Sequence, residues 1–306
     1  MNEKFYISSS PHIHSKNSTQ RIMLDVIISL LPALIAGAII FGTSALLVVA
    51  VCIASCVALE WAFNAMLKKP QTISDLSAVV TGLLLGLNLP ATTPIWQCII
   101  GSVFAIIIVK CVFGGIGKNI VNPAVSARVF MTIAFASLAA PAFPLDSTSS
   151  ATPLVELSEG ANLSAVDLFL GNYGGAIGET CTLALLIGGI YLICRRVITW
   201  HIPVVFIGTV FVLSLLYGDM NINFALTQIL SGGLFIGAIF MATDYVTSPA
   251  TAWGKVIFAV FAGLITCMIR FYGNYPEGVS FAILLANILD PYIDKWTTRK
   301  LFGGDK

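Results

Sequence analysis

Long apolar runs constrain the fold of this chain most strongly. Residues 22–41, 43–66 and 177–193 are each close to the roughly 20 apolar residues that a membrane-spanning helix needs. Charged residues make up 10% of the sequence, against about 25% in soluble domains. Since backbone amides in hydrocarbon must be hydrogen-bonded within the chain, these runs are expected to be helices. The sequence therefore predicts an all-α integral membrane protein.

About ten transmembrane helices are expected when the apolar runs are divided at turns and helix breakers. They cover about residues 22–41, 44–66, 74–89, 95–113, 121–140, 177–194, 200–217, 223–242, 254–271 and 277–295. The third and eighth spans are short and end in Asn88-Leu89-Pro90 and Ala242-Thr243-Asp244. These ends predict helices that are broken inside the membrane, which is tolerated where the freed backbone lines a cavity.

The positions of the basic residues predict the topology. In a ten-span arrangement, fourteen of the 16 Lys and Arg residues fall on one side of the membrane, Arg270 lies on the other side, and Arg128 lies within the fifth span. Lys and Arg are enriched on the cytoplasmic side. We therefore expect residues 1–306 to form a single membrane domain with both termini in the cytoplasm and the segment 141–176 outside.

The two halves of the chain resemble each other. "VVTGLLLGLNLPATTP" (79–94) is similar to "ILSGGLFIGAIFMATDYVTSP" (229–249), and "KCVFGGIGKNIVNPAVS" (110–126) to "IRFYGNYPEGVSFAILL" (269–285). An odd number of spans per repeat places the halves in opposite orientations. This predicts two inverted five-helix repeats, about 22–140 and 177–295. The alternative is that Gly, Thr and Pro recur by chance in a membrane chain.

Polar side chains within or beside the spans are candidates for a functional site, because such groups are costly in a membrane. Arg128 is the deepest cation, and the alternative to a functional role is a buried ion pair with Asp75 or Asp244. Asn119 and Asn122 are three positions apart at the start of the fifth span and are expected to share a helix face. Such a pair can bind a planar heterocycle. For Asn119, helix capping is the alternative.

Several classes of function lack their sequence signals. The seven cysteines contain no C-x-x-C pair. Of the three histidines, His12 and His14 lie two positions apart, but no third metal ligand is evident beside them. A G-x-S-x-G motif, a Walker loop and a G-x-G-x-x-G motif are also absent from the sequence. We therefore expect neither a hydrolase nor a nucleotide-driven pump, no bound metal and no nucleic-acid partner.

Seven segments occur in the order typical of one family of membrane subunits. The chain resembles the family that includes the D-type subunits of the Rnf-type ion-translocating ferredoxin:NAD⁺ oxidoreductases and the B-type subunits of the sodium-pumping NADH:quinone oxidoreductases. The quinone-reducing relatives have a longer N-terminal extension, so the Rnf-type subunit is the closer match. The segments are SPHIHS (10–15), MLDVIISLLPA (23–33), TGLLLGLNLP (81–90), FGGIGKNIVNPAVSARVF (113–130), GGAIGETCTLALLIGGIYL (174–192), GAIFMATDYVTSPAT (237–251) and NYPEGVSFAILLANILDPYID (274–294).

The hydroxyl-rich segment DSTSSATPL (146–154) acquires a role through this resemblance. Members of the family carry FMN covalently, through the flavin phosphate, on the threonine of a D-x-x-[ST]-G-A-T motif. The resemblance implies FMN on Thr152, and a serine stands where the motif has glycine. Small neighbours, an external position and Pro153, which disfavours a helix interior, suit an acceptor loop. The alternative is a plain Ser/Thr-rich linker. The matching residues are Asp146, Ser149, Ser150, Ala151 and Thr152.

The resemblance also implies a second, non-covalent flavin. The quinone-reducing relative binds riboflavin near an asparagine pair in a G-x-N-x-x-N-P segment, which matches Asn119 and Asn122 here, and Asp244 is a further candidate for that site. Electrons would cross the membrane between flavins while Na⁺ or H⁺ moves outward. The implied partners are the A-, B-, C-, E- and G-type subunits of an Rnf complex, a flavin transferase and the lipid of the bacterial cytoplasmic membrane. NAD⁺ and ferredoxin would bind other subunits.

Three alternatives to this function remain open from the residues. One is the B-type subunit of a quinone-reducing pump, and another is a urea- or ammonium-type channel, because inverted five-helix repeats also build such channels. A purely structural anchor for other redox subunits is the third. The channel and the anchor would carry no flavin, so a visible spectrum of the purified chain separates them from a flavin carrier.

Overall fold

The computed structural model describes residues 18–135, 153–158, 164–171, 173–273 and 277–298. Among these residues, the regular structure is helical and contains no β-strand. The first half consists of α1 (Thr19–Phe41), α2 (Thr43–Met66), the 3₁₀-helix η1 (Ile73–Asp75), α3 (Ser77–Leu87), α4 (Ile95–Val103), the π-helix η2 (Phe104–Cys111) and α5 (Pro123–Ala134). The predicted all-α class is confirmed.

The second half follows two short helices, α6 (Pro153–Ser158) and α7 (Ala165–Leu170). It consists of α8 (Thr182–Cys194), α9 (His201–Tyr217), α10 (Ile222–Leu230), α11 (Leu234–Ile236), the π-helix η4 (Gly237–Met241), α12 (Ala252–Tyr272) and α13 (Val279–Thr297). Each range expected to span the membrane thus contains one helix or a run of consecutive helical segments. The chain is a multi-pass membrane protein.

The helices differ in length more than the sequence predicted. Three of the described helices, α1, α2 and α12, are long and apolar enough to cross a membrane. Helix α10 and the segment α11–η4 form a pair that is bent by 65°, and the pair is a fourth such span if it is counted as one broken helix. The other apolar helices are shorter; α3 has 11 residues and α5 has 12. Several predicted spans are therefore only partly helical.

The breaks have local causes. Helix α3 ends at Leu87, where the side chain of Asn88 donates to the carbonyl of Leu84 at 2.7 Å and Pro90 prevents further helix. This break lies where it was predicted. The eighth span ends at Met241, next to the predicted end at residues 242–244, but it has a further break that was not predicted, after Leu230, where Gly232 has a positive φ of 70°. Two consecutive glycines lower the cost of this break.

Small residues let the helices of the first half approach closely. A Cβ atom on Gly82 would lie 2.7 Å from the Cα of Ile53, and one on Gly86 would lie 2.8 Å from the Cα of Val49. Helix α3 therefore packs against α2 backbone to backbone, as in other membrane helix pairs with small residues. The two halves meet where α1 packs on α8 and α5 packs on α13.

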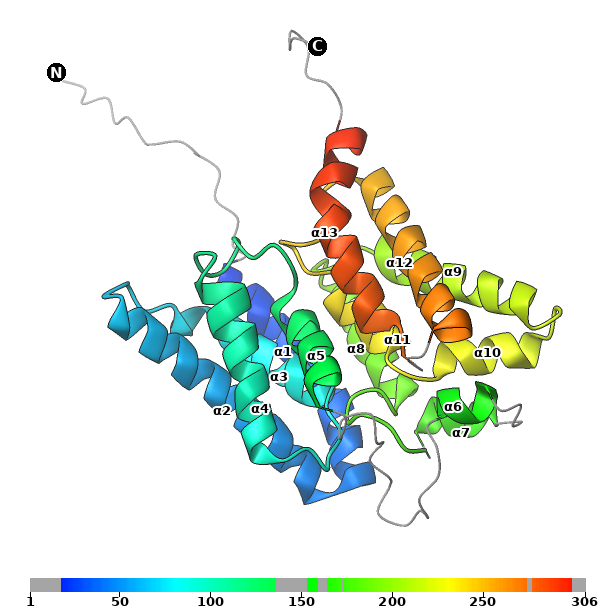
Figure 1. Ribbon diagram of the computed structural model, residues 1–306, viewed down its shortest axis with the longest axis horizontal. Helices are drawn as coiled ribbons and strands as arrows, with labels where there is room; N and C mark the ends of the chain where they lie inside the picture. Colours follow the sequence, from blue (N-terminus) through cyan, green and yellow to red (C-terminus); the bar gives the residue numbers. More distant parts are fainter. Residues whose placement is uncertain (1–17, 136–152, 159–163, 172, 274–276, 299–306) are drawn as a thin grey trace, which may run out of the picture.

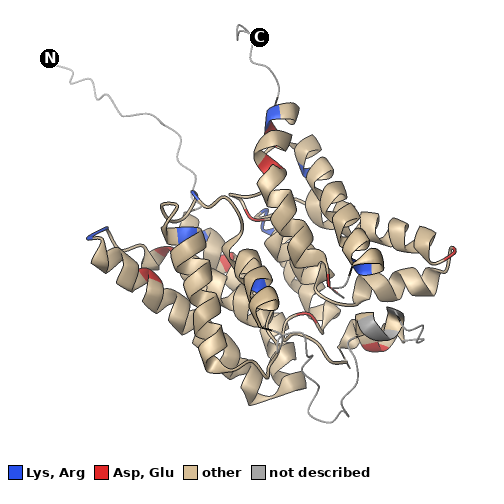
Figure 2. Ribbon diagram, viewed as in Figure 1, with Lys and Arg blue, Asp and Glu red and all other residues tan. Residues whose placement is uncertain are grey.

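Helix α1 begins and α13 ends on the same side of the molecule, at the top of Figure 1, which we call the terminal side. Most of the described Lys and Arg residues lie on this side (Figure 2). Helices α6 and α7 lie on the other side (Figure 1), which we call the opposite side. This distribution of charge agrees with the asymmetry read from the sequence.

Candidate functional site

A cavity of about 300 Å³ lies on the terminal side, where α1, α3, α5 and η4 converge. Its volume is at the lower limit of small-molecule pockets, which hold roughly 300–1,000 Å³. The wall is mainly apolar, with side chains such as Ile22, Leu84 and Phe240. A few polar groups interrupt this wall: Thr19, Ser77, Thr81, Lys110, Asn119, Asn122, Thr243, Asp244 and Tyr245. A largely apolar pocket with few polar groups suits a flat organic ligand.

The structure brings Asn119, Asn122 and Asp244 together around this cavity, although Asp244 is more than a hundred residues away in the sequence. The predicted shared helix face is wrong, because α5 begins only at Pro123. Asn119 lies in the preceding turn, and Asn122 is the residue that caps the helix. The side chains of Asn119 and Asn122 nevertheless both line the cavity, because the turn before α5 forms part of the cavity wall.

Asn122 has the helix-capping role that was the alternative for Asn119. Its Oδ1 accepts from the backbone N–H groups of Ala124 at 3.0 Å and Val125 at 3.3 Å, which caps α5. Its Nδ2 donates to the carbonyl of Met241 at 3.2 Å, at the end of η4. Asn122 thus joins the start of α5 to the end of η4, and so connects the two halves beneath the cavity.

Asn119 and Asp244 face the cavity with fewer constraints. The Nδ2 of Asn119 donates to the carbonyl of Val121 at 3.1 Å, and its amide also interacts with the carboxylate of Asp244. Asp244 accepts in turn from the hydroxyl of Thr247 at 3.3 Å. The amide oxygen of Asn119 can serve as an acceptor for a ligand N–H group.

Lys110 was missed as a site residue. Its charge was counted among the fourteen basic residues on one side of the membrane, whereas the structure places it inside η2 with 3% of its surface exposed. Its Nζ donates to Glu60 Oε2 at 2.7 Å and to Ser77 Oγ at 2.6 Å, and Lys110 and Ser77 both line the cavity. Glu60 could have indicated this role, because a carboxylate inside the second apolar run requires a cationic partner within the membrane.

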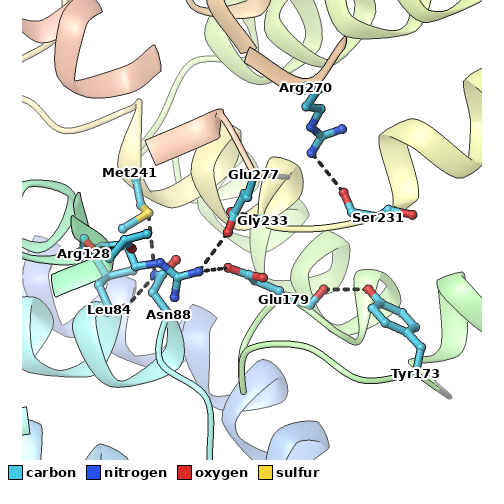
Figure 3. Close-up of polar contacts among 11 residues, drawn as sticks. Leu84, Asn88, Arg128, Tyr173, Glu179, Ser231, Gly233, Met241, Arg270 and Glu277 are labelled. Carbon is cyan, nitrogen blue, oxygen red and sulfur yellow. Dashed lines mark hydrogen bonds and ion pairs between the residues drawn. The ribbon is translucent and has the colours of Figure 1, made fainter. Parts of the chain in front are cut away.

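A second polar group, which we call the charged cluster, consists of Arg128, Glu179 and Glu277 (Figure 3). The Nη2 atom of Arg128 lies 2.8 Å from Glu277 Oε2 and 3.3 Å from Glu179 Oε1. The side chains of Arg128, Glu277 and Glu179 are 12%, 19% and 6% exposed, respectively. The predicted burial of Arg128 in an ion pair is confirmed. The proposed partners Asp75 and Asp244 are wrong.

The distance along α5 explains this correction. Arg128 is six residues beyond the cap residue Asn122, which is roughly 9 Å along a helix that rises about 1.5 Å per residue. It therefore lies away from the cavity wall that contains Asp244. Asp75 has other partners, since it accepts from the N–H of Ser77 at 2.8 Å and from its hydroxyl at 2.5 Å.

The charged cluster lies against the break between α10 and α11. Glu277 Oε1 accepts from the backbone N–H of Gly233 at 3.2 Å, and a side chain at position 233 would collide with the Glu277 carboxylate. Arg270 donates to the carbonyl of Gln228 at 2.6 Å and to that of Ser231 at 3.1 Å, at the end of α10; Figure 3 shows the contact with Ser231. Charged side chains thus satisfy the backbone groups that the break frees, as a membrane interior requires.

The predicted flavin-attachment residues Asp146, Ser149, Ser150, Ala151 and Thr152 lie outside the residues that the structure describes. The described chain resumes at Pro153, the first residue of α6, a position where proline is favoured. Leu154 is buried, and its side chain lies beside Gly232 at the break of the eighth span. The residues that directly follow the motif are therefore packed against the break, on the opposite side of the molecule from the cavity.

These features together define a multi-pass helical membrane protein that has a ligand-sized cavity and a largely buried ion-pair cluster at a broken helix. The chain belongs to the NQR2, RnfD, RnfE family, whose family model matches residues 6–303. The family resemblance inferred from the seven segments is confirmed.

Named relatives cover the chain almost from end to end. It is 48% identical to the D subunit of a Na⁺-translocating ferredoxin:NAD⁺ oxidoreductase complex of Acetobacterium woodii, over 100% of this chain and 98% of the relative. It is 41% identical to the D subunit of a proton-translocating ferredoxin:NAD⁺ oxidoreductase complex of Clostridium ljungdahlii, over 98% and 96%. It is 36% identical to the D subunit of an ion-translocating oxidoreductase complex of Actinobacillus succinogenes, over 98% of each chain.

Proposed function

We propose that this chain is the flavin-carrying membrane subunit of an ion-translocating ferredoxin:NAD⁺ oxidoreductase complex of the Rnf type. Within such a complex, it passes electrons across the membrane, coupled to the movement of Na⁺ or H⁺. The near-complete match to three relatives that are named as the D subunits of ion-translocating oxidoreductase complexes carries this proposal. The other subunits supply the sites for ferredoxin and NAD⁺.

The cavity supports a non-covalent flavin of the riboflavin type. A flavin, when bound, supplies a ring that takes up and gives back one or two electrons. The apolar wall fits the faces of such a ring, and the amide oxygen of Asn119 fits the N–H of its imide edge. The hydroxyl oxygens of Ser77 and Thr243 lie on the same wall and can act as acceptors, since their O–H groups already donate to Asp75 and to the carbonyl of Ile239. Asp244 interacts with the amide of Asn119.

Asn119→Leu is expected to weaken riboflavin binding by about fivefold to a hundredfold, and so to lower the riboflavin that can be extracted from the purified chain. The reason is that one or two hydrogen bonds, together worth about 1–3 kcal/mol, would be lost at the ring edge. Asn122 is unsuitable for this test because its replacement also removes the cap of α5. Flavin is measured by fluorescence of the supernatant after acid precipitation.

The matched control is Asn223→Leu, which changes an exposed amide away from the cavity in the same way. It should retain the flavin of the unchanged chain. Equal flavin in Asn119→Leu and the control would remove Asn119 from the site, and a purified chain without extractable flavin would overturn the cavity as a flavin site.

The covalent flavin is proposed for Thr152, as an FMN phosphoester formed by a separate flavin transferase outside the cytoplasm. The proposal rests on the match of the segment 146–152 to the family motif. Pro153 begins α6 directly after the acceptor, and α6 packs on the opposite side from the cavity. Two flavins in these places would serve opposite sides of the membrane.

The proposed location is the bacterial cytoplasmic membrane, with the terminal side in the cytoplasm. In a Cys194→Ser background, a cysteine in place of Val166, which is 65% exposed on α7, should react with a membrane-impermeant maleimide in intact cells. A cysteine in place of Lys69, exposed on the terminal side, should react only after the cells are opened. The reverse pattern would invert the topology and exclude flavin attachment outside the cytoplasm.

Two other functions predict different spectra. A channel or a structural anchor would show no visible flavin absorption, whereas a flavin carrier purified from cells that contain the transferase would show it. A B-type subunit of a quinone-reducing pump would also carry flavin. It would differ in its partners, so co-purification with the ferredoxin-linked or the quinone-linked subunits distinguishes these two.

A further inference from the structure

Lys110 is the one cation among the described residues that line the cavity. Its ammonium group is nearly inaccessible to solvent, and it lies in η2, a π-helix of eight residues that continues α4. Departures from α-helical geometry of this kind are frequent at functional sites. A buried lysine in a membrane segment is costly unless it is paired, and such residues are usually functional.

The ammonium group is held from two sides. It donates to Glu60 Oε2 at 2.7 Å on α2 and to Ser77 Oγ at 2.6 Å at the start of α3. Two of its three N–H groups are used in this way, which leaves the third for a ligand. Lys110 and Ser77 both line the cavity, so the ion pair of Lys110 with Glu60 adjoins its wall.

Further hydrogen bonds fix these two partners. Thr72 donates its hydroxyl to Glu60 Oε1 at 2.5 Å, and Asn64 donates to Thr72 at 3.0 Å. The hydroxyl of Ser77 donates to Asp75 at 2.5 Å. A group that is held by this many contacts is preorganised, so it can stabilise a new charge without moving.

We propose that Lys110 sets the reduction potential of the flavin bound in this cavity, and that Glu60 moderates its effect. The inference rests on the proposed function. An electron delivered by a reduced carrier elsewhere in the complex brings one negative charge to the ring. In a buried site, a fixed positive charge a few ångströms away favours that charge, and the carboxylate of Glu60 opposes it. Lys110 is thus the group that stabilises the reduced ring.

The test uses the full chain with Thr152→Ala, which leaves the cavity flavin as the flavin under study, reloaded with riboflavin and titrated against redox dyes. Lys110→Met should lower the equilibrium constant for one-electron reduction by about tenfold or more, which is about 59 mV. Glu60→Gln should raise it, because the lysine charge is then uncompensated. Lys110→Arg should stay close to the parent, as should the exposed Lys69→Met.

Opposite shifts in Lys110→Met and Glu60→Gln are the distinctive result, because a structural role would disturb both variants in the same way. If Lys110→Met fails to fold, the neutral pair Lys110→Met/Glu60→Gln replaces it, and its potential should lie below that of Glu60→Gln alone. Potential shifts of the same sign in the two variants, or no shift in a chain that binds riboflavin, would overturn the proposed role of Lys110 but not the cavity flavin. A parent chain that binds no riboflavin would overturn the proposed cavity flavin and this inference together.

Discussion

The Thr152→Ala chain is expected to lose all of its covalent FMN. A phosphoester requires a hydroxyl oxygen, and Thr152 is the residue that matches the acceptor of the family motif. A covalent flavin survives denaturation, so the unchanged chain should appear as a fluorescent band on a denaturing gel under ultraviolet light when the transferase is present. The band should be absent for Thr152→Ala.

Neighbouring hydroxyls provide the controls for this result. Thr148→Ala removes a hydroxyl within the same segment and should keep the band, while Ser150→Gly restores the usual motif glycine and should keep or strengthen it. A fluorescent Thr152→Ala chain would move the attachment to another hydroxyl of the segment. A wild-type chain that stays dark beside an active transferase would refute covalent attachment.

The same variant should stop electron transfer from ferredoxin to NAD⁺ in the assembled complex. A missing carrier leaves a gap that side chains cannot bridge, whereas removing the hydroxyl and one methyl group of a single side chain should cost little stability. Membrane insertion and subunit assembly should therefore be unchanged. Comparing Thr152→Ala with Thr148→Ala in purified complexes separates the loss of the flavin from a general effect of a substitution in the segment 146–152.

The helices were predictable because burial in lipid makes the sequence pattern simple. Apolar runs bounded by Pro, Gly and charged residues place α1, α2 and α12 within a few residues of their observed limits. The break after α3 follows from Asn88 and Pro90, which stop a helix locally. The inverted relation of the two halves stays a prediction.

The site was predictable only in part, because its contacts join distant parts of the chain. Asn119 and Asp244 were each selected as polar residues at helix ends, yet their common cavity depends on how α5 and η4 pack. Lys110 lies near the end of the fourth predicted span and was counted among the basic residues on one side of the membrane. Its burial depends on Glu60, which is fifty residues earlier in the sequence and on another helix.

The charged cluster shows the same limit. A lone arginine in an apolar span predicts a carboxylate partner, but hydropathy carries no information about which carboxylate the fold brings near. Glu179 and Glu277 are 51 and 149 positions from Arg128 and lie in short segments before α8 and α13. The structure therefore adds an expectation about stability that the sequence could not provide.

Arg128→Met is expected to destabilise the protein by about 3–5 kcal/mol, the usual cost of leaving one side of a buried ion pair unpaired. The substitution keeps the apolar stem but leaves the buried carboxylate of Glu179 and the partly buried carboxylate of Glu277 without this cation. Without Arg128, the carboxylates of Glu179 and Glu277 repel each other. Because Glu277 accepts from the N–H of Gly233, its displacement should also loosen the break of the eighth span. The measurement is the temperature at which half of the detergent-solubilised chain remains monodisperse, with Asn223→Leu as the control.

The triple variant Arg128→Met/Glu179→Gln/Glu277→Gln distinguishes charge from packing. It removes all three charges and keeps side chains of similar size, and neutral replacements of buried ion pairs often restore stability. We expect it to regain most of the stability that Arg128→Met loses, although it should assemble without the ion pairs that join α5 to the chain before α8 and α13. A triple variant as unstable as Arg128→Met would show that the arginine acts through packing, and an Arg128→Met chain as stable as the control would show that the two carboxylates need no cation.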